Sequence, residues 1–208
     1  MQQLWLIPVL PLLGFLINGL FGKRLPKSVV TLVAIAAPVL SFLWVIKTLF
    51  AISPLETAYV ERYFTWIQSG FLEIPVELAV DRLTAVMLLV VTGIGSLIHV
   101  YASGDMAEGD GYYRFFAYLN LFMFSMLVLV LANNWVLLFV GWELVGLSSY
   151  SLIGFWYHKR SAALAAKKAF IVNRVGDVGF ALGIFAIFLN TGTMNIQESL
   201  EILVSPTA

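Results

Sequence analysis

Six apolar stretches, each about as long as a bilayer is thick, dominate this sequence. They run over about 4–22, 28–52, 80–102, 113–132, 134–157 and 166–190. A membrane-spanning helix needs about 20 mostly apolar residues, each adding roughly 1.5 Å of length. Charged residues make up only 12% of the sequence, about half the share that a soluble domain carries. The pattern predicts an all-α integral membrane protein with about six transmembrane helices.

Polar turns divide the chain into five predicted segments. Residues 1–52 hold two leading transmembrane helices, 53–79 form a loop, 80–110 hold the third helix and the loop after it, 111–190 hold helices four to six, and 191–208 form a tail. Inside the loop, two apolar and aromatic runs flank Ser69 and Gly70, which predicts a short β-hairpin at the membrane surface. The tail has a polar turn, a short amphipathic stretch and an abrupt stop. We therefore also expect the chain to be a truncated piece of a longer protein.

The basic residues predict how the chain is oriented in the membrane. One side of the predicted topology carries eight of them, namely Lys23, Arg24, Lys27, Arg114, Lys159, Arg160, Lys167 and Lys168. The other side carries only Lys47, Arg62 and Arg82. Because short cytoplasmic loops are enriched in Lys and Arg, the first side is predicted to face the cytoplasm. We expect a multi-pass protein of the cell inner (plasma) membrane with its N-terminus and its 53–79 loop outside.

Several classes of site are excluded by what the sequence lacks. There are no cysteines, and the two histidines, His99 and His158, are far apart. These counts exclude disulfides and thiolate-bound iron–sulfur clusters, and they argue against a metal site. The 12 basic and 12 acidic residues balance, so there is no electrostatic footprint for nucleic acid. We expect no cofactor and no catalytic redox site in this chain.

Glu143 is an acidic residue in the middle of a predicted span. It lies nine residues after Asn134, which places it roughly 13 Å from the outer end of the helix, near the bilayer midplane. A charged side chain there costs about 2.5–3.5 kcal/mol on insertion scales, so it is expected to face a protein or water-filled interior. Two interpretations stay open: a neutral acid hydrogen-bonded to a neighbouring helix, or a functional acid that is a proton carrier or a member of an ion pair.

Arg174 and Asp177 form a second charged group within the sixth span. They are three residues apart, so they can pair on one helix face, and a self-neutralising ion pair is one interpretation. Arg174 is near enough to the cytoplasmic rim to extend partly toward water, whereas Asp177 lies deeper. His99, late in the third span, is either part of a proton relay or an interfacial residue of the aromatic belt beside Tyr101.

Two motifs in these spans resemble a known family. They are Gly-Trp-Glu-Leu-Val-Gly-Leu-Ser-Ser-Tyr at 141–150 and Lys-Ala-Phe-Ile-Val-Asn-Arg-Val-Gly-Asp at 168–177, supported by Val-Asp-Arg-Leu-Thr-Ala-Val-Met at 80–87. Together they resemble the antiporter-like subunit L (chain 5) of proton-pumping NADH:quinone oxidoreductase, respiratory complex I, over residues 1 to about 200. The large A-type subunit of the multisubunit sodium/proton antiporters is the alternative family.

The resemblance implies that this chain is the leading part of a larger antiporter-like fold with inverted repeats. It implies a role in proton translocation for Glu143, Asp177, Arg174, Lys168 and His99, with Glu143 working with a lysine beyond this chain. It also implies partners: the other membrane-arm subunits, above all a neighbouring antiporter-like subunit. NADH, flavin, iron–sulfur clusters and quinone are then expected in those partners. The alternatives are a cation/proton antiporter subunit without a redox partner, or a fragment inactive alone.

Overall fold

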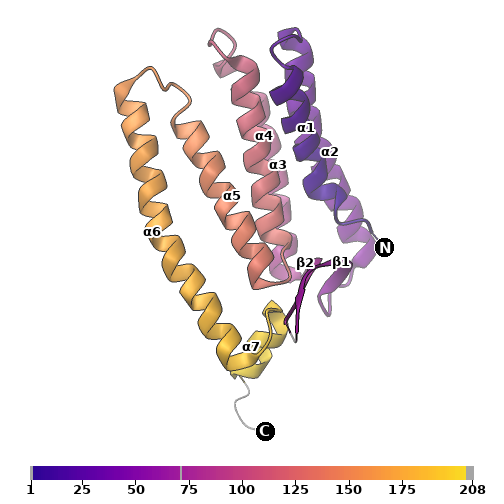
Figure 1. Cartoon of the computed structure of the whole chain (residues 1–208). Coiled ribbons are helices and arrows are strands. Elements are labelled where there is room, and N and C mark those ends of the chain that lie inside the picture. Colours follow the sequence, from indigo (N-terminus) through magenta and orange to yellow (C-terminus); the bar gives the residue numbers. More distant parts are fainter. Residues whose placement is uncertain (1, 71, 205–208) are drawn as a thin grey trace.

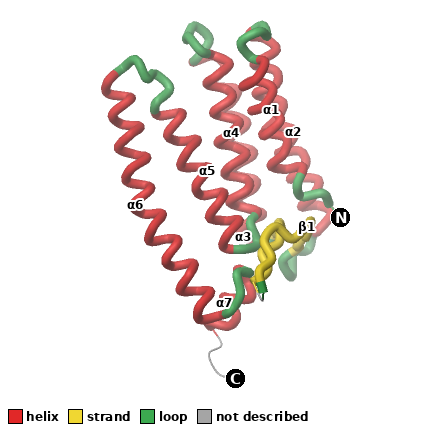
Figure 2. The backbone as a smooth tube through the Cα atoms, in the orientation of Figure 1, coloured by secondary structure: helices red, strands yellow, loops and turns green. Residues whose placement is uncertain are grey.

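The computed structural model describes residues 2–70 and 72–204, and helices dominate that part of the chain (Figures 1 and 2). The helices are α1 (Leu6–Phe21), α2 (Lys27–Ile52), α3 (Arg82–Asp105), α4 (Tyr112–Leu131), α5 (Trp135–Ile153), α6 (Arg160–Thr191) and α7 (Ile196–Val204). Two strands, β1 (Tyr59–Ser69) and β2 (Leu72–Val80), separate α2 from α3. Helices α1 to α4 pack on one another, α5 packs on α4, and α6 lies beyond α5 at one edge.

Five helices, α2 to α6, are long and apolar enough to cross a membrane. α1 is also apolar but has only 16 residues, a length of about 24 Å. The prediction of about six transmembrane helices therefore corresponds to five full-length spans and one short helix. α6 has 32 residues and begins at Arg160 instead of near residue 166. At about 48 Å it exceeds the hydrocarbon thickness, so it must tilt or extend into water.

A proline inside α1 is compensated by a side chain from α2. Pro11 has no N–H to donate, so the carbonyl of Ile7 loses its helical partner. The hydroxyl of Ser41, which is fully buried, donates to that carbonyl at 2.7 Å. In a bilayer, each backbone group left without a partner costs several kcal/mol. This one hydrogen bond therefore fixes α1 and α2 in register.

α4 and α5 form a tight antiparallel hairpin, as the short Asn133–Asn134 connection predicts. The side chain of Asn134 caps α5 by accepting the N–H of Leu137 at 2.8 Å. Farther along, Gly141 allows the two helices to touch, because a Cβ there would lie 2.7 Å from the Cα of Leu129. This close approach holds the middle of α5 against α4.

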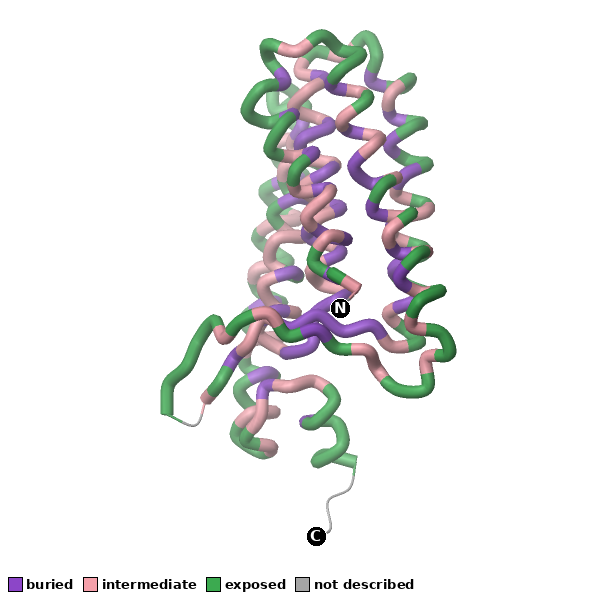
Figure 3. The backbone as a smooth tube through the Cα atoms, turned by 90° about the vertical axis from the view of Figure 1, so that its right-hand side faces the viewer, coloured by how far each residue is buried: buried purple, intermediate pink, exposed green. Residues whose placement is uncertain are grey.

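The predicted β-hairpin is present, and it is longer than the sequence pattern suggests. β1 and β2 pair antiparallel from Tyr59 opposite Val80 to Ser69 opposite Leu72. Gly70 has a φ of 59°, a conformation that glycine adopts without strain. Figure 3 shows buried residues extending from the helical bundle into the hairpin, and β2 becomes fully buried toward Val80.

One carboxylate on this hairpin anchors the start of the chain. Glu61 accepts the N–H groups of Gln3 at 3.1 Å and Leu4 at 2.9 Å, and also contacts the N–H of Gln2. The hydroxyls of Tyr59 and Tyr63 donate to the same carboxylate at 2.8 and 2.6 Å. Burial raises the pKa of Glu61, but these hydrogen bonds lower it more, so the net pKa lies below its ordinary value.

Candidate functional site

The two charged groups predicted from the sequence meet in one cluster between α5 and α6. The guanidinium of Arg174 on α6 forms an ion pair with Glu143 on α5. The same guanidinium lies 3.4 Å from the carboxylate of Asp177, one turn farther along α6. The indole N–H of Trp142 donates to the other oxygen of Asp177 at 2.9 Å. Four residues from two helices therefore form a continuous polar cluster.

The cluster lies midway along helices that are apolar enough to cross a membrane. Glu143 is about halfway along the 19 residues of α5. The hydrogen bond from Trp142, its neighbour in sequence, places Asp177 at nearly the same depth. Asp177 is buried, while the side chains of Glu143 and Arg174 are 24% and 39% exposed. In a bilayer spanned by these helices, the charges would lie near the midplane, where they depend on one another for compensation.

The structure contains the predicted pair of Arg174 and Asp177 and adds a second carboxylate, that of Glu143, to it. Arg174 does not extend toward the basic rim. Instead, its side chain lies over the ring of Phe170, 4.6 Å from the centroid, and contacts carboxylates on both helices. Among the residues the structure describes, the cluster contains two carboxylates and one guanidinium. With both acids ionised it therefore carries one negative charge in excess.

A hollow of about 440 Å³ adjoins the cluster between α4, α5 and α6. Asp177 and Trp142 line it, together with Asn173 and Ser149. Since a water molecule occupies about 30 Å³ in the liquid, the hollow has room for several. Asp177 thus contacts both the guanidinium and a space that can hold water, which is the placement a proton-exchanging acid requires.

His99 and Lys168 lie outside this cluster. His99 is buried in α3, and its ring faces Phe116 of α4 at 6.4 Å. The interpretation of His99 as an interfacial belt residue is therefore wrong. Its Nδ1 lies 2.7 Å from the carbonyl of Gly95; because a carbonyl only accepts, Nδ1 carries a proton. Lys168 is exposed on α6, and no carboxylate in the described residues lies within ion-pair distance of it.

Sequence reasoning missed Trp142 as a member of the site. Tryptophan near the ends of spans indicates interfacial anchoring, and nothing in a single sequence shows that an indole in mid-span faces an acid. The available signal was its position directly before Glu143 in the middle of an apolar span, because an indole N–H without water around it needs an acceptor. Ser148, five residues after Glu143, links α5 to α4, because its hydroxyl lies 3.3 Å from that of Ser125.

Two family descriptions match the regions that contain these elements. Residues 66–116 match "NADH-Ubiquinone oxidoreductase (complex I), chain 5 N-terminus". Residues 132–207, which contain the whole charged cluster, match "NADH:quinone oxidoreductase/Mrp antiporter, TM". The chain belongs to this antiporter-like family. It is a multi-pass membrane protein whose relatives are subunits of multisubunit membrane complexes.

Curated relatives of this family extend well beyond the present chain. NADH-quinone oxidoreductase subunit L of Mycobacterium tuberculosis is 49% identical over 194 residues, covering 92% of this chain and 30% of the relative. Subunit L of Escherichia coli is 44% identical over 207 residues, covering 97% of this chain and 33% of the relative. The chain therefore spans about a third of the length of the curated relatives it matches.

Solved structures show the same fold. One subunit of the Mrp complex from Dietzia sp. superposes with a TM-score of 0.82 at 25% identity, covering 99% of this chain and 21% of that one. One subunit of the archaeal membrane-bound sulfane sulfur reductase superposes with a TM-score of 0.81 at 18% identity, covering 96% and 39%. The antiporter-like architecture of the leading helices is thus common to complexes with different names.

Proposed function

We propose that this chain is the amino-terminal part of a proton-translocating membrane-arm subunit of NADH:quinone oxidoreductase. The subunit couples quinone reduction, carried out in other subunits, to proton movement across the cell inner (plasma) membrane. Both complex I-type family descriptions and the subunit L relatives support this assignment. The excess of basic residues on one side supports an orientation with the N-terminus outside.

The unequal charge of the α5–α6 cluster carries the proposal. Arg174 compensates one of the two carboxylates of Glu143 and Asp177, and the remaining negative charge in mid-membrane is costly. That charge is removed either by a proton or by a further cation supplied from outside the described residues. Alternation between these two forms of compensation takes up and releases one proton per cycle at an acid of the cluster.

The chain's own residues divide this work. Glu143 is the proposed protonatable switch, because it joins α5 to α6 through Arg174 and is partly exposed. Arg174 and Asp177 set the charge that Glu143 experiences, and Trp142 holds Asp177 in place through its N–H. NADH, flavin, iron–sulfur clusters and quinone are assigned to partner subunits, so this chain contributes transport and no redox chemistry. Its proposed neighbours are other membrane-arm subunits, above all another antiporter-like one.

The test is Glu143→Gln in the intact complex, with Glu108→Gln as the matched control. Both changes remove one carboxyl charge, but Glu108 is exposed in the turn after α3. The proton-to-electron ratio is measured in vesicles with NADH as electron donor. We expect the Glu143 variant to lower that ratio or to slow turnover, and the control to leave both unchanged. Unchanged pumping and turnover in the Glu143 variant would refute the proposal.

A sodium/proton antiporter subunit is the second candidate, favoured by the likeness to the Mrp complex at 25% identity. The same charged cluster serves either function, because both move protons across the membrane. In the first candidate quinone reduction drives this movement, and in the second it is coupled to the movement of sodium. The mass and composition of the native complex separate the two candidates. Co-purification with NADH-oxidising and quinone-reducing subunits supports the first, whereas small membrane proteins without redox activity support the second.

A further inference from the structure

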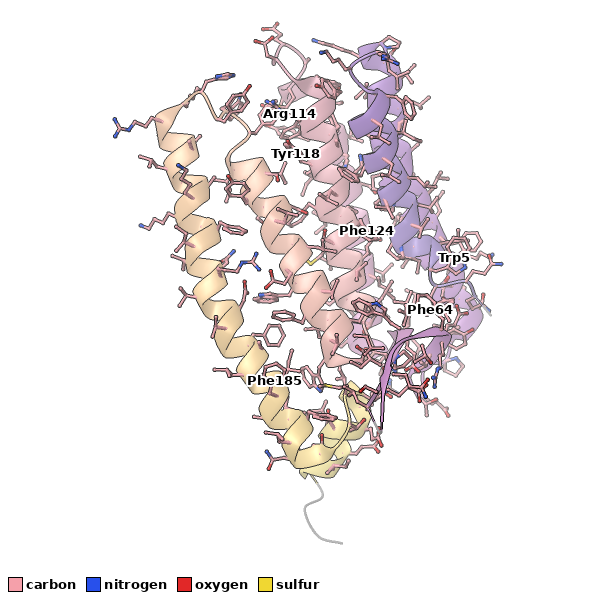
Figure 4. The ribbon with its side chains drawn as sticks, in the orientation of Figure 1. Trp5, Phe64, Arg114, Tyr118, Phe124 and Phe185 are labelled. Atoms are coloured by element: carbon pink, nitrogen blue, oxygen red, sulfur yellow. The ribbon has the colours of Figure 1, made fainter. Side chains whose placement is uncertain are left out.

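Two hollows meet at one arginine near the start of α4. The first, of about 320 Å³, lies between α4, α5 and α6, and both Arg114 and Lys167 line it. The second, of about 380 Å³, lies between α1 and α4, and it is largely apolar, with Leu16 and Leu20 among its walls. Arg114 and Tyr118 line both hollows, and Figure 4 shows them together at the same end of α4.

Arg114 is fixed in position, but its charge is not compensated. One of its terminal nitrogens donates to the carbonyl of Phe155 at 3.3 Å. The guanidinium stacks over the rings of Phe155 and Tyr157, 5.0 and 5.1 Å from their centroids. Its Nε is buried and has no hydrogen-bond partner. No carboxylate in the described part of the chain forms a salt bridge with Arg114 or with Lys167.

The depth of these two cations matches that of lipid headgroups. Arg114 is in the first turn of α4. A Cβ on Gly154, at the end of α5, would lie 3.2 Å from the Cβ of Ala166, so Lys167 is level with the end of α5. Both cations therefore lie at the membrane–water boundary, on the side predicted to face the cytoplasm. Anionic lipids are attracted to basic sites on that side.

We propose that this region binds the phosphate of an anionic membrane lipid. The phosphate lies in the first hollow between Arg114 and Lys167, where the arginine supplies a fixed fork of N–H donors and the lysine a flexible point charge. Tyr150 and Tyr157 line the same hollow. One acyl chain of the lipid follows the apolar hollow along α1, where Leu20 is 71% exposed.

The adjoining apolar hollow favours a lipid over free phosphate. A soluble anion would use only the first hollow, which both cations line, whereas a lipid fills both hollows with Arg114 at their junction. The proposal is independent of proton transport, because neither cation belongs to the α5–α6 cluster. It assigns Arg114 and Lys167 to lipid recognition.

The test measures lipid binding to the intact complex by native mass spectrometry after delipidation. Phosphatidylglycerol is titrated against Arg114→Gln/Lys167→Gln and against the control Arg24→Gln/Arg160→Gln, which removes the same charge from the same side. Because Arg114 and Lys167 donate directly to the phosphate and the control residues do not, we expect the first pair to lose about 25-fold in affinity, about fivefold for each residue. The control is expected to change affinity less than about twofold.

Lys167→Gln alone tests the proposal even if the arginine variant does not fold, because Lys167 is exposed and its replacement should leave the fold intact. We expect this single variant to bind phosphatidylglycerol about fivefold more weakly than the wild type. Two further probes identify the source of the phosphate: phosphatidylcholine should bind more weakly than phosphatidylglycerol, and inorganic phosphate should not displace the lipid. Equal losses in both double variants, equal binding of the two lipids, or displacement by inorganic phosphate would each overturn the proposal.

Discussion

Removing Arg174 should destabilise the protein, and removing a second charge should partly repair it. In Arg174→Gln, the carboxylates of Glu143 and Asp177 both lose the guanidinium that contacts them. Breaking a buried ion pair from one side costs about 3–5 kcal/mol. Because the Arg174 side chain is 39% exposed, we expect less than this range, about 2–3 kcal/mol.

The partial repair follows from counting charges. With both acids ionised, the cluster has a net charge of −1 in the wild type, −2 in Arg174→Gln, and −1 in Arg174→Gln/Glu143→Gln. The double variant should therefore recover about 1–2 kcal/mol relative to Arg174→Gln. Glu143→Gln alone brings the net charge to zero and should be at least as stable as the wild type, although it is expected to pump less. Stability and transport then change in opposite directions.

The assay is the temperature at which half of the assembled complex is lost, followed on native gels in mild detergent. The expected order of midpoints is wild type, then the double variant, then Arg174→Gln. Arg160→Gln, at the exposed start of α6, serves as the charge-matched control and should resemble the wild type. A double variant no more stable than Arg174→Gln would refute the charge-counting argument, as would an Arg174→Gln midpoint equal to that of the wild type.

Two further predictions concern the packing that supports the cluster and the start of the chain. Gly141→Ala places a Cβ 2.6 Å from the backbone nitrogen of Leu129, so it should force α5 from α4 at a cost of about 1–3 kcal/mol and lower pumping. Glu61→Gln removes an acceptor shared by several donors and should cost about 2–4 kcal/mol of stability at neutral pH. The pKa of Glu61 is lower in the folded protein than in the unfolded chain. The carboxylate's contribution to the free energy of unfolding is therefore complete above the unfolded pKa of about 4.3, and it is lost as the pH falls through the folded pKa.

The controls for these predictions come from the same elements. Gly146→Ala, also on α5, meets no atom within 4 Å and should match or slightly exceed the wild type in heat stability. An equal effect of the two glycine substitutions would contradict the packing argument. For Glu61, the difference in stability between wild type and variant should narrow toward acidic pH, and a difference independent of pH would show that the carboxylate charge has no part in anchoring the start of the chain.

The membrane spans and the cluster's charged residues were predictable because their signals are local. A run of apolar residues and an acid in its middle are visible without a fold, since the cost of burying a charge depends on depth. The choice of partner was not predictable. Asp177 lies three residues after Arg174 on the same helix, so their pairing is visible in the sequence. Only the packing of α6 on α5 brings Glu143 to the same guanidinium.

His99 shows a different limit of sequence reasoning. Tyr101, two residues later, is 74% exposed, whereas His99 is 2% exposed. Residues two apart on a helix point in nearly opposite directions, so the neighbour's surroundings say little about those of the histidine. The helix α6 also begins earlier than the apolar span predicted over 166–190. Lys167 and Lys168 interrupt the apolar pattern, but a helix can continue past the membrane boundary into water, and α6 does so to Arg160.

The hydrogen bond from Ser41 to Ile7 has a consequence for how the protein is made. As α1 leaves the ribosome it carries a bare carbonyl, because Pro11 cannot serve it, and lipid offers no donor. Ser41, which donates to this carbonyl, is synthesised later, as part of α2. Glu61 on β1, which accepts the N–H groups of Gln3 and Leu4, is synthesised later still. The backbone of the first helix and of the residues before it is therefore satisfied in two steps, first by α2 and then by β1, both of which are translated after it.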